Sequence, residues 1–187
     1  PSIAAADGGD AGARPPLFVS IDVAGVPASP PPPDASTIKV ERSFYTTGGK
    51  PWTPAPLKEG DALIVAVSIT SDVPVRDALL TDLLPAGLEI ENFNLGDAKQ
   101  WADVVVAGVN LGERSEAAKV RHEEFRDDRY VAALDLDAGR TARVFYLVRA
   151  VTPGSYAVPP PMVEDMYRPD VRGVGRAVPS SITVVQP

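Results

Sequence analysis

Alternating apolar and polar side chains predict that most of this chain folds into β-strands. Ile38, Val40 and Phe44 lie on one face of an extended segment and are separated by polar residues, which is the two-residue period of a half-buried strand. Residues 61–70 repeat this period. Residues 141–151 carry apolar side chains on both faces, a pattern typical of a central strand. We therefore expect a sheet with the last of these segments in its interior.

Further strands are expected where short apolar runs end at turn signals. Residues 119–125 and 129–136 are predicted to form a hairpin, because the Arg-Asp-Asp sequence between them favours a turn. The other expected strands cover residues 17–23, 77–84, 88–90, 155–158 and 182–185. About eight to ten short strands without a long helical pattern favour an all-β, antiparallel sandwich of immunoglobulin-like kind. The Cys…Trp…Cys core of true immunoglobulin domains is absent from the sequence.

Residues 96–118 show no clear hydrophobic period and are predicted to form a long connection. Residues 97–101 and 113–118 each have a composition compatible with one helical turn. Long connections inside compact domains are often functional, and others are mobile. The role of this segment stays open at the level of the sequence.

Proline and glycine are frequent, with 20 and 15 residues among 187, and such punctuation argues against long helices. Pro30 to Pro33 favour a stiff polyproline II segment. We interpret it as an extended, Pro-rich spacer between domains. The alternative, a ligand for an SH3 or WW domain, lacks a basic anchor in the flanking residues.

The sequence predicts that the chain is divided into three segments. Residues 1–16 are small and polar and predict a flexible tail, because they offer too little apolar surface to offset the entropy of ordering. Residues 17–36 are predicted to hold a strand and the Pro-rich connection, and residues 37–187 the sandwich. A signal peptide, an initiator Met and an apolar run near membrane-spanning length are all missing, so we expect a fragment of a larger protein.

Composition limits the chemistry that this chain can perform. The net charge of −7 argues against nucleic-acid binding, which requires a basic surface. The absence of cysteine excludes disulfides, thiolate catalysis and Cys-type zinc sites. Nucleophile-elbow and Walker-type phosphate motifs are also absent from the sequence. We therefore expect neither an enzyme nor a cofactor.

A metal site has one weak candidate around the predicted 126–128 turn. His122 is the single histidine of the chain. An all-carboxylate calcium site is conceivable nearby, with Glu123, Glu124, Asp127 and Asp128 as ligands. The regular spacing of known calcium loops is absent. We favour a solvated hairpin tip with weak ion pairs to neighbouring arginines.

Residues 159–173 form the most unusual stretch of the chain and contain both of its methionines. Pro169 cannot donate a backbone hydrogen bond and biases Arg168 towards an extended backbone. Met166 and Tyr167 are therefore predicted to precede a bend, with at least one side chain accessible. Methionine is adaptable and tyrosine is amphipathic, a pairing suited to covering a pocket of a partner. The alternative, which composition alone favours, places Met166 in the core and packs Tyr167 within a strand.

Several stretches in this order resemble the C-terminal end of bacterial alpha-2-macroglobulins. They are Asp-Leu-Leu-Pro-Ala-Gly-Leu-Glu at 82–89, Phe-Arg-Asp-Asp-Arg-Tyr-Val-Ala-Ala at 125–133, Phe-Tyr-Leu-Val-Arg-Ala-Val-Thr-Pro-Gly at 145–154, Val-Pro-Pro-Pro at 158–161 and Glu-Asp-Met-Tyr-Arg-Pro at 164–169. The resemblance extends from Leu17 to the C-terminus. Its specificity comes from the order of the stretches rather than from any one of them.

The resemblance implies the last macroglobulin-like domain of a large periplasmic protein that offers a bait region to proteases. In this family, cleavage of the bait triggers a conformational change that entraps the protease. Thioester-bearing members also bind covalently, through a Cys-x-Glu-Gln motif in a separate helical domain on which the C-terminal domain packs. Met166 and Tyr167, followed by Arg168, match a Met-Tyr pair that helps to shield the thioester from water. An apolar, aromatic lid suits that task because it excludes water from a reactive acyl group.

This chain has no cysteine, so it cannot carry a thioester itself, and in a parent without one the pair would keep only a docking role. The resemblance implies a non-catalytic module that helps hold the uncleaved state. Its partners would be other domains of the same large polypeptide and, through the full-length protein, target proteases. The implied location is periplasmic, with or without a membrane anchor at the parent's N-terminus. The alternative is an immunoglobulin-like structural or adhesive repeat of a bacterial surface protein, although no internal repeat is found in the sequence.

Overall fold

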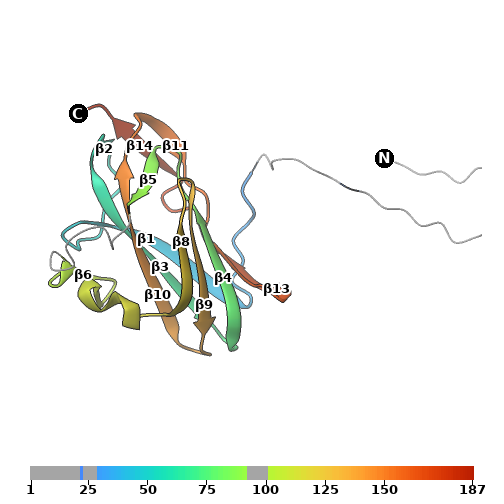
Figure 1. The fold of residues 1–187 in the computed structure, drawn as a ribbon. Helices are drawn as coiled ribbons and strands as arrows, with labels where there is room; N and C mark the ends of the chain where they lie inside the picture. The colour runs from blue at the N-terminus through green and yellow to red at the C-terminus, as the bar shows by residue number, and fades with distance from the viewer. Residues whose placement is uncertain (1–21, 23–28, 92–100) are drawn as a thin grey trace, which may run out of the picture.

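The computed structural model describes residues 22, 29–91 and 101–187, which form two antiparallel sheets packed face to face (Figure 1). The four-stranded sheet consists, in order, of β1 (Ile38–Thr46), β3 (Ala62–Ser71), β10 (Thr141–Ala150) and β5 (Leu88–Glu91). The five-stranded sheet consists of β13 (Arg168–Val174), β12 (Met162–Asp165), β4 (Val75–Leu83), β9 (Arg129–Leu136) and β8 (Lys119–Phe125). The all-β sandwich predicted from the sequence is confirmed.

A small third sheet closes one end of the sandwich, near the C-terminus in Figure 1. It consists of β11 (Gly154–Ala157), β14 (Ser181–Val185) and β2 (Leu57–Lys58). β14 pairs antiparallel with β11 and parallel with β2. Ile182 and Val184 turn inwards from β14 and are buried in the main core, so this sheet covers the open end of the sandwich.

The strands form where the alternation predicts them. The burial of β1 alternates residue by residue from Ile38 to Phe44, because one face meets the core and the other meets solvent. β10 lies between β3 and β5, and both of its faces are largely buried, as expected for a central strand. β8 and β9 form the predicted hairpin with the predicted bounds. The strand expected at 17–23 lies outside the described residues, apart from the single position 22.

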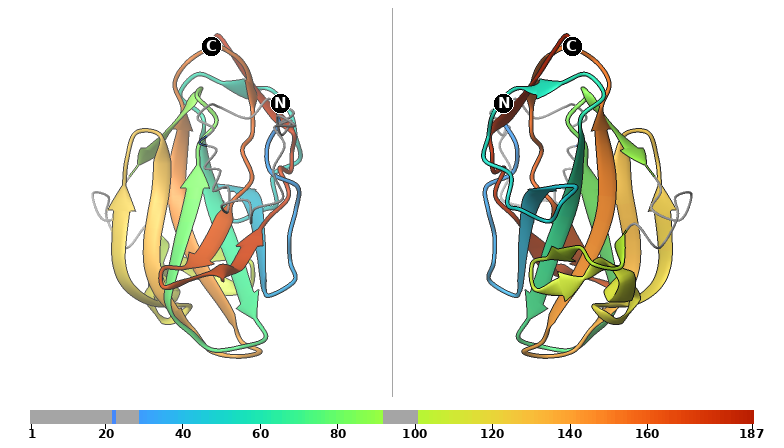
Figure 2. Two further views of the ribbon diagram at one scale, coloured as in Figure 1. Left: turned by 90° about the vertical axis from the view of Figure 1, so that its right-hand side faces the viewer. Right: turned by 90° about the vertical axis from the view of Figure 1, so that its left-hand side faces the viewer.

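The strands that the sequence does not predict include two that form a hairpin near the C-terminus. Residues 162–165 and 168–174 form the β12–β13 hairpin, which lies at one side of the sandwich beside β4 (Figures 1 and 2). The bend expected just after Met166 and Tyr167 is instead formed by these two residues, and Pro169 lies within β13. β13 is the last strand of its sheet, and an edge strand tolerates a residue that cannot donate to the ladder.

The segment expected to be a long connection covers the outer face of the four-stranded sheet. Its described part holds β6 (Val105–Val106), β7 (Val109–Asn110) and the 3-10 helix η3 (Leu111–Glu116). The helical turn expected at 113–118 is thus present as 3-10 helix, shifted by two residues. The turn expected at 97–101 lies outside the described residues except for position 101.

This cover has a small hydrophobic core of its own, on the opposite side of the four-stranded sheet from the main core (Figure 2). The buried side chains of this second cluster are Ile64, Ala66, Trp101, Val106, Leu111, Phe145 and Leu147. Phe145 and Leu147 come from the outward face of β10. The apolar residues on both faces of β10 therefore have separate functions, one set in each core.

The main core contains a charged pair that joins the two sheets. Nη1 of Arg42 on β1 lies 2.5 Å from Oδ1 of Asp82 on β4, and both side chains are at most 1% exposed. Nη2 of Arg42 also donates to the carbonyl of Pro159 at 2.6 Å. The Tyr146 hydroxyl donates to the other carboxylate oxygen of Asp82 at 2.6 Å. Burial raises the pKa of the Asp82 carboxyl, while the Arg42 charge and the Tyr146 hydrogen bond act in the opposite direction.

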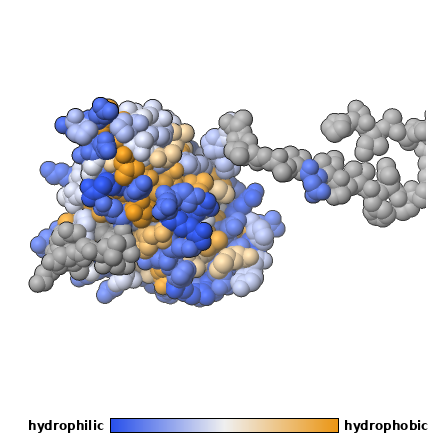
Figure 3. Space-filling model, turned by 45° about the horizontal axis from the view of Figure 1, so that its top comes forward, coloured by the Kyte–Doolittle hydropathy of each residue, from blue (hydrophilic) through white to orange (hydrophobic). Residues whose placement is uncertain are grey.

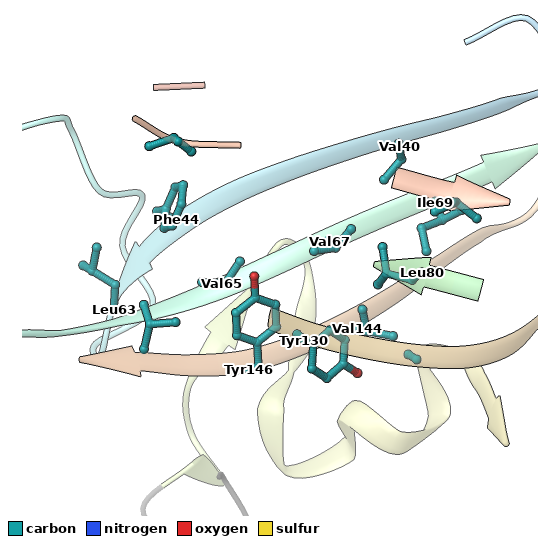
Figure 4. Close-up of a cluster of buried hydrophobic side chains, with 14 of the residues drawn as sticks. Val40, Phe44, Leu63, Val65, Val67, Ile69, Leu80, Tyr130, Val144 and Tyr146 are labelled. Carbon is teal, nitrogen blue, oxygen red and sulfur yellow. The ribbon is translucent and has the colours of Figure 1, made fainter. Parts of the chain in front are cut away.

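Two tyrosines, Tyr130 and Tyr146, lie side by side among aliphatic side chains of the main core (Figure 4). The rings of Tyr130 and Tyr146 stack with centroids 4.7 Å apart and planes 20° from parallel. The Tyr130 hydroxyl donates to the Glu123 carboxylate on the neighbouring strand. The hydroxyls of Tyr130 and Tyr146 and both oxygens of Asp82 therefore have partners, whereas Nε of Arg42 is buried without an acceptor among the described residues.

We predict that the Arg42–Asp82 pair is strongly coupled. Arg42→Met or Asp82→Leu alone leaves an uncompensated buried charge and should lower the free energy of unfolding by about 3–5 kcal/mol. The double variant should lose clearly less than the sum of the two, as measured by urea unfolding. Lys39→Met on the same strand breaks the exposed Lys39–Glu41 pair and should cost less than about 1 kcal/mol. Simple additivity in the double variant would contradict the coupling.

Candidate interdomain docking site

Met166 and Tyr167 form the two-residue tip of the β12–β13 hairpin. The Tyr167 side chain is 79% exposed and Met166 is 45% exposed. Neither residue fills the core or packs within a strand, so the alternative open at the sequence level is not what the structure shows. The prediction that at least one of these side chains is accessible is confirmed, and here it applies to both.

Large exposed apolar side chains are concentrated on this hairpin. The described residues hold seven such side chains, namely Val73, Val105, Met162, Met166, Tyr167, Val178 and Val185. Three of the seven belong to the hairpin, and Tyr167 is the most exposed of them all. Figure 3 shows one face of the molecule, on which hydrophobic residues lie in a band between hydrophilic ones. A concentration of apolar groups at a projecting turn is typical of a contact surface rather than of a solvated loop.

The buried carboxylate of Asp165 fixes the shape of the turn. Asp165 is 4% exposed. Its Oδ1 accepts the backbone N–H of Tyr167 at 2.9 Å and that of Arg168 at 3.0 Å. Its Oδ2 accepts Nε of Arg168 at 2.8 Å. Side-chain capping of this kind holds the backbone of a turn in one conformation.

The hydrogen bonds also set the charge state of Asp165. Burial by itself raises the pKa of the Asp165 carboxyl, but the Tyr167 and Arg168 N–H groups and the Arg168 guanidinium outweigh it, and the pKa is lowered overall. The carboxylate is therefore the form that the turn requires at neutral pH. The Arg168 guanidinium bonds the Asp165 carboxylate. Through this contact Arg168 helps to hold the turn that carries Met166 and Tyr167.

The base of the hairpin is attached to the start of the four-stranded sheet. Arg172 exchanges two hydrogen bonds with the Thr37 hydroxyl, at 2.7 and 3.1 Å. The backbones of Asp34 and Val174 also pair, at 2.8 and 2.9 Å. A Cβ at Gly173 would lie 2.0 Å from the carbonyl oxygen of Ile38, so only glycine permits this close approach. The tip is exposed, but the strands that carry it are held from both sides.

Three of the four carboxylates considered for calcium, all except Asp127, have partners within their own hairpin. Glu123 accepts the Tyr130 hydroxyl, Glu124 pairs with Arg126, and Asp128 pairs with Arg129. Within residues 22, 29–91 and 101–187 no group of three or more His, Asp or Glu side chains is placed to hold a metal ion.

Comparison with known proteins identifies the family. The model for the bacterial alpha-2-macroglobulin MG10 domain matches residues 38–170. The chain belongs to this family. The match includes β12 and the Met166–Tyr167 tip, and it places the resemblance noted in the sequence on a firm basis.

Curated relatives and solved structures agree with this assignment. An alpha-2-macroglobulin from Xylella fastidiosa strain Temecula1 is 66% identical over 92% of this chain, and the one from Escherichia coli K12 is 41% identical over 92%. The native conformation of E. coli alpha-2-macroglobulin superposes with a TM-score of 0.77 at 40% identity, over 86% of this chain and 10% of that one. The chain spans 10% of the length of these two curated relatives.

Two further similar structures are of alpha-2-macroglobulins that had reacted with an amine or a protease. One is Salmonella alpha-2-macroglobulin reacted with methylamine, with a TM-score of 0.75, 37% identity, and coverage of 86% of this chain and 10% of that chain. Another is trypsin-activated alpha-2-macroglobulin from E. coli, with a TM-score of 0.75, 39% identity, and coverage of 87% of this chain and 11% of that chain.

No helix within residues 22, 29–91 and 101–187 is long and apolar enough to cross a membrane.

We predict that Asp165 stabilises the domain through the turn. Asp165→Ala leaves the N–H groups of Tyr167 and Arg168 without their acceptor and should lower the free energy of unfolding by about 1–3 kcal/mol. Asp165→Asn keeps one acceptor oxygen and should cost less. The matched control is Asp170→Ala on the adjoining strand, where the side chain is exposed. Equal melting temperatures for Asp165→Ala and Asp170→Ala would contradict this role.

The same contact predicts a pH dependence with a defined sign. Because the folded state lowers the pKa of Asp165, its stabilisation is present above the unfolded value of about 3.9 and is lost as pH falls through the lower folded value. Asp165→Asn has no titrating group at this position. The stability difference between the two proteins should therefore shrink between about pH 4 and pH 2, as measured by urea unfolding. A difference that stays constant over this range would disprove the assignment.

Proposed function

We propose that this chain is a non-catalytic docking module of a bacterial alpha-2-macroglobulin-type protease trap. The observation that carries the proposal is an exposed Met166–Tyr167 tip on a turn held by a buried carboxylate. An exposed aromatic side chain on a rigid turn loses little conformational entropy on contact, which favours binding. Support comes from the family, in which the chain corresponds to a tenth of the full polypeptide, so other domains of the same polypeptide are the first candidates for a partner.

The tip would dock on a neighbouring, thioester-type helical domain and help to hold the uncleaved state. Tyr167 presents a flat apolar surface with a polar end, and Met166 adapts to irregular surfaces. Together they would keep water away from a reactive acyl group on the partner. In a parent without a thioester the same contact would serve docking alone. Target proteases would be met by the full-length protein, and a periplasmic location belongs to the same proposal.

Tyr167→Ala in the full-length parent tests this function. In a thioester-bearing parent we expect faster reaction with methylamine, because the lid over the acyl group is incomplete. The melting temperature of the isolated domain should not change, since the Tyr167 side chain is 79% exposed. Tyr167→Phe keeps the ring and serves as the matched control. Unchanged methylamine reactivity in Tyr167→Ala would refute the shielding role.

Docking needs a separate measurement, because methylamine reports only on a parent that carries a thioester. Limited proteolysis of the parent at the linkers flanking this domain reports whether the domain is held against its neighbour. Tyr167→Ala should increase cleavage there, whereas Asp170→Ala should leave it unchanged. Equal cleavage in both variants would argue against docking through the tip.

A further inference from the structure

A second candidate site lies at the opposite edge of the five-stranded sheet from the Met166–Tyr167 tip. A cavity of about 390 Å³ opens between β8, β10 and η3. β8 is the outermost strand on this side, and β5 pairs with β10 only along Leu147–Ala150. Residues 141–146 of β10 pair with β3 on one side, and on the other side, towards the cavity, no strand of their own sheet pairs with them among the described residues.

Arg143 lines this cavity with a guanidinium group that has no partner among residues 22, 29–91 and 101–187. The residue is half-buried, and its Nε is shielded from solvent without a hydrogen-bond acceptor. No hydrogen bond or ion pair of its side chain occurs within the part of the chain that the structure describes. Its backbone N–H donates to the carbonyl of Ala117 at 2.9 Å, so the strand beneath it is fixed.

The other arginines of the cavity are engaged. Arg121 donates to Asp77 and Asp135, and Arg114 donates to the carbonyl of Leu111. Arg143 is thus the lining arginine whose donors remain available. A buried N–H group without an acceptor, here the Nε–H of Arg143, is costly, and an anion that accepts it would remove that cost.

The walls of the cavity strengthen this preference. Phe125, Val144 and Phe145 supply apolar surface, which lowers the local dielectric constant and strengthens a charged hydrogen bond. Glu123 is the acidic side chain in the lining, and it already accepts the Tyr130 hydroxyl. The cavity is therefore cationic although the chain carries a net charge of −7.

We propose that this cavity binds a carboxylate, with Arg143 as its charged donor. A planar carboxylate matches the parallel N–H groups of a guanidinium. The volume lies within the common range for ligand sites and accommodates an acidic side chain or a small organic acid. Both sources offer the same chemistry. Since the chain is a tenth of its curated relatives, an acidic side chain elsewhere in the polypeptide is one source, and a free organic acid is the other.

The test follows the backbone amide resonances of the cavity residues Gly112, His122 and Phe145, which every variant retains, by NMR in the isolated chain, whose main core is enclosed by its own strands. Sodium acetate replaces sodium chloride at constant ionic strength. We expect a saturable shift of these resonances and at least about a tenfold weaker binding in Arg143→Gln. Arg143→Lys keeps the charge without the fork and should bind weakly. Arg140→Gln, at an exposed position in the preceding turn, is the control and should bind as the unmodified chain does.

A shift that rises linearly without saturation, or one that is equal in Arg143→Gln and Arg140→Gln, would overturn the proposal. Circular dichroism of each variant checks that it is folded. Calorimetry with acetate on the full polypeptide then separates the sources. Acetate binding to both proteins identifies a free organic acid, and binding to the isolated chain alone identifies an acidic side chain of the polypeptide. These outcomes do not depend on Tyr167, so this proposal and the docking proposal can fail separately.

Discussion

The buried pair of Arg42 and Asp82 is the constraint on which the arrangement of the two sheets depends. It connects β1 in one sheet to β4 in the other. An ion pair inside an apolar core is tolerated only when both charges stay within hydrogen-bond distance, so the sheets cannot slide past each other without a large penalty. Arg42 also holds the carbonyl of Pro159, three residues before β12. The position of the Met166–Tyr167 hairpin therefore follows from the same contact.

Local patterns predict much of this fold from the sequence. The alternation in β1 and the turn between β8 and β9 are local signals, and both elements form as expected. The β12–β13 hairpin is not predicted, because its strands are short and Pro169 suggests a bend. Its stability comes from pairing with β4 and from contacts with Thr37 and Asp34, which are remote in sequence. Pairings between distant segments leave no local trace.

The residues of the two candidate sites also differ in how far the sequence alone reveals them. Met166 and Tyr167 stand out as apolar residues beside a proline, and the resemblance draws attention to them. Asp165 does not stand out, because carboxylates are common in this acidic chain, yet its buried oxygens hold the turn. The one local signal is an aspartate two and three residues before the N–H groups that it accepts. In the sequence, Arg143 is an ordinary polar residue of a predicted strand. Only the tertiary structure shows that its side-chain donors have no acceptor among the described residues.

The two sites also lie at opposite edges of one sheet, and this placement has a mechanical consequence. β13 carries the tip at one edge and β8 borders the Arg143 cavity at the other. A domain attached to its neighbours at one edge can still pivot about that contact, whereas attachment at both edges fixes its orientation. A conformational change transmitted through the parent polypeptide would have to release both contacts. An apolar contact and a charged contact respond differently to salt, so the two edges can be released under different conditions.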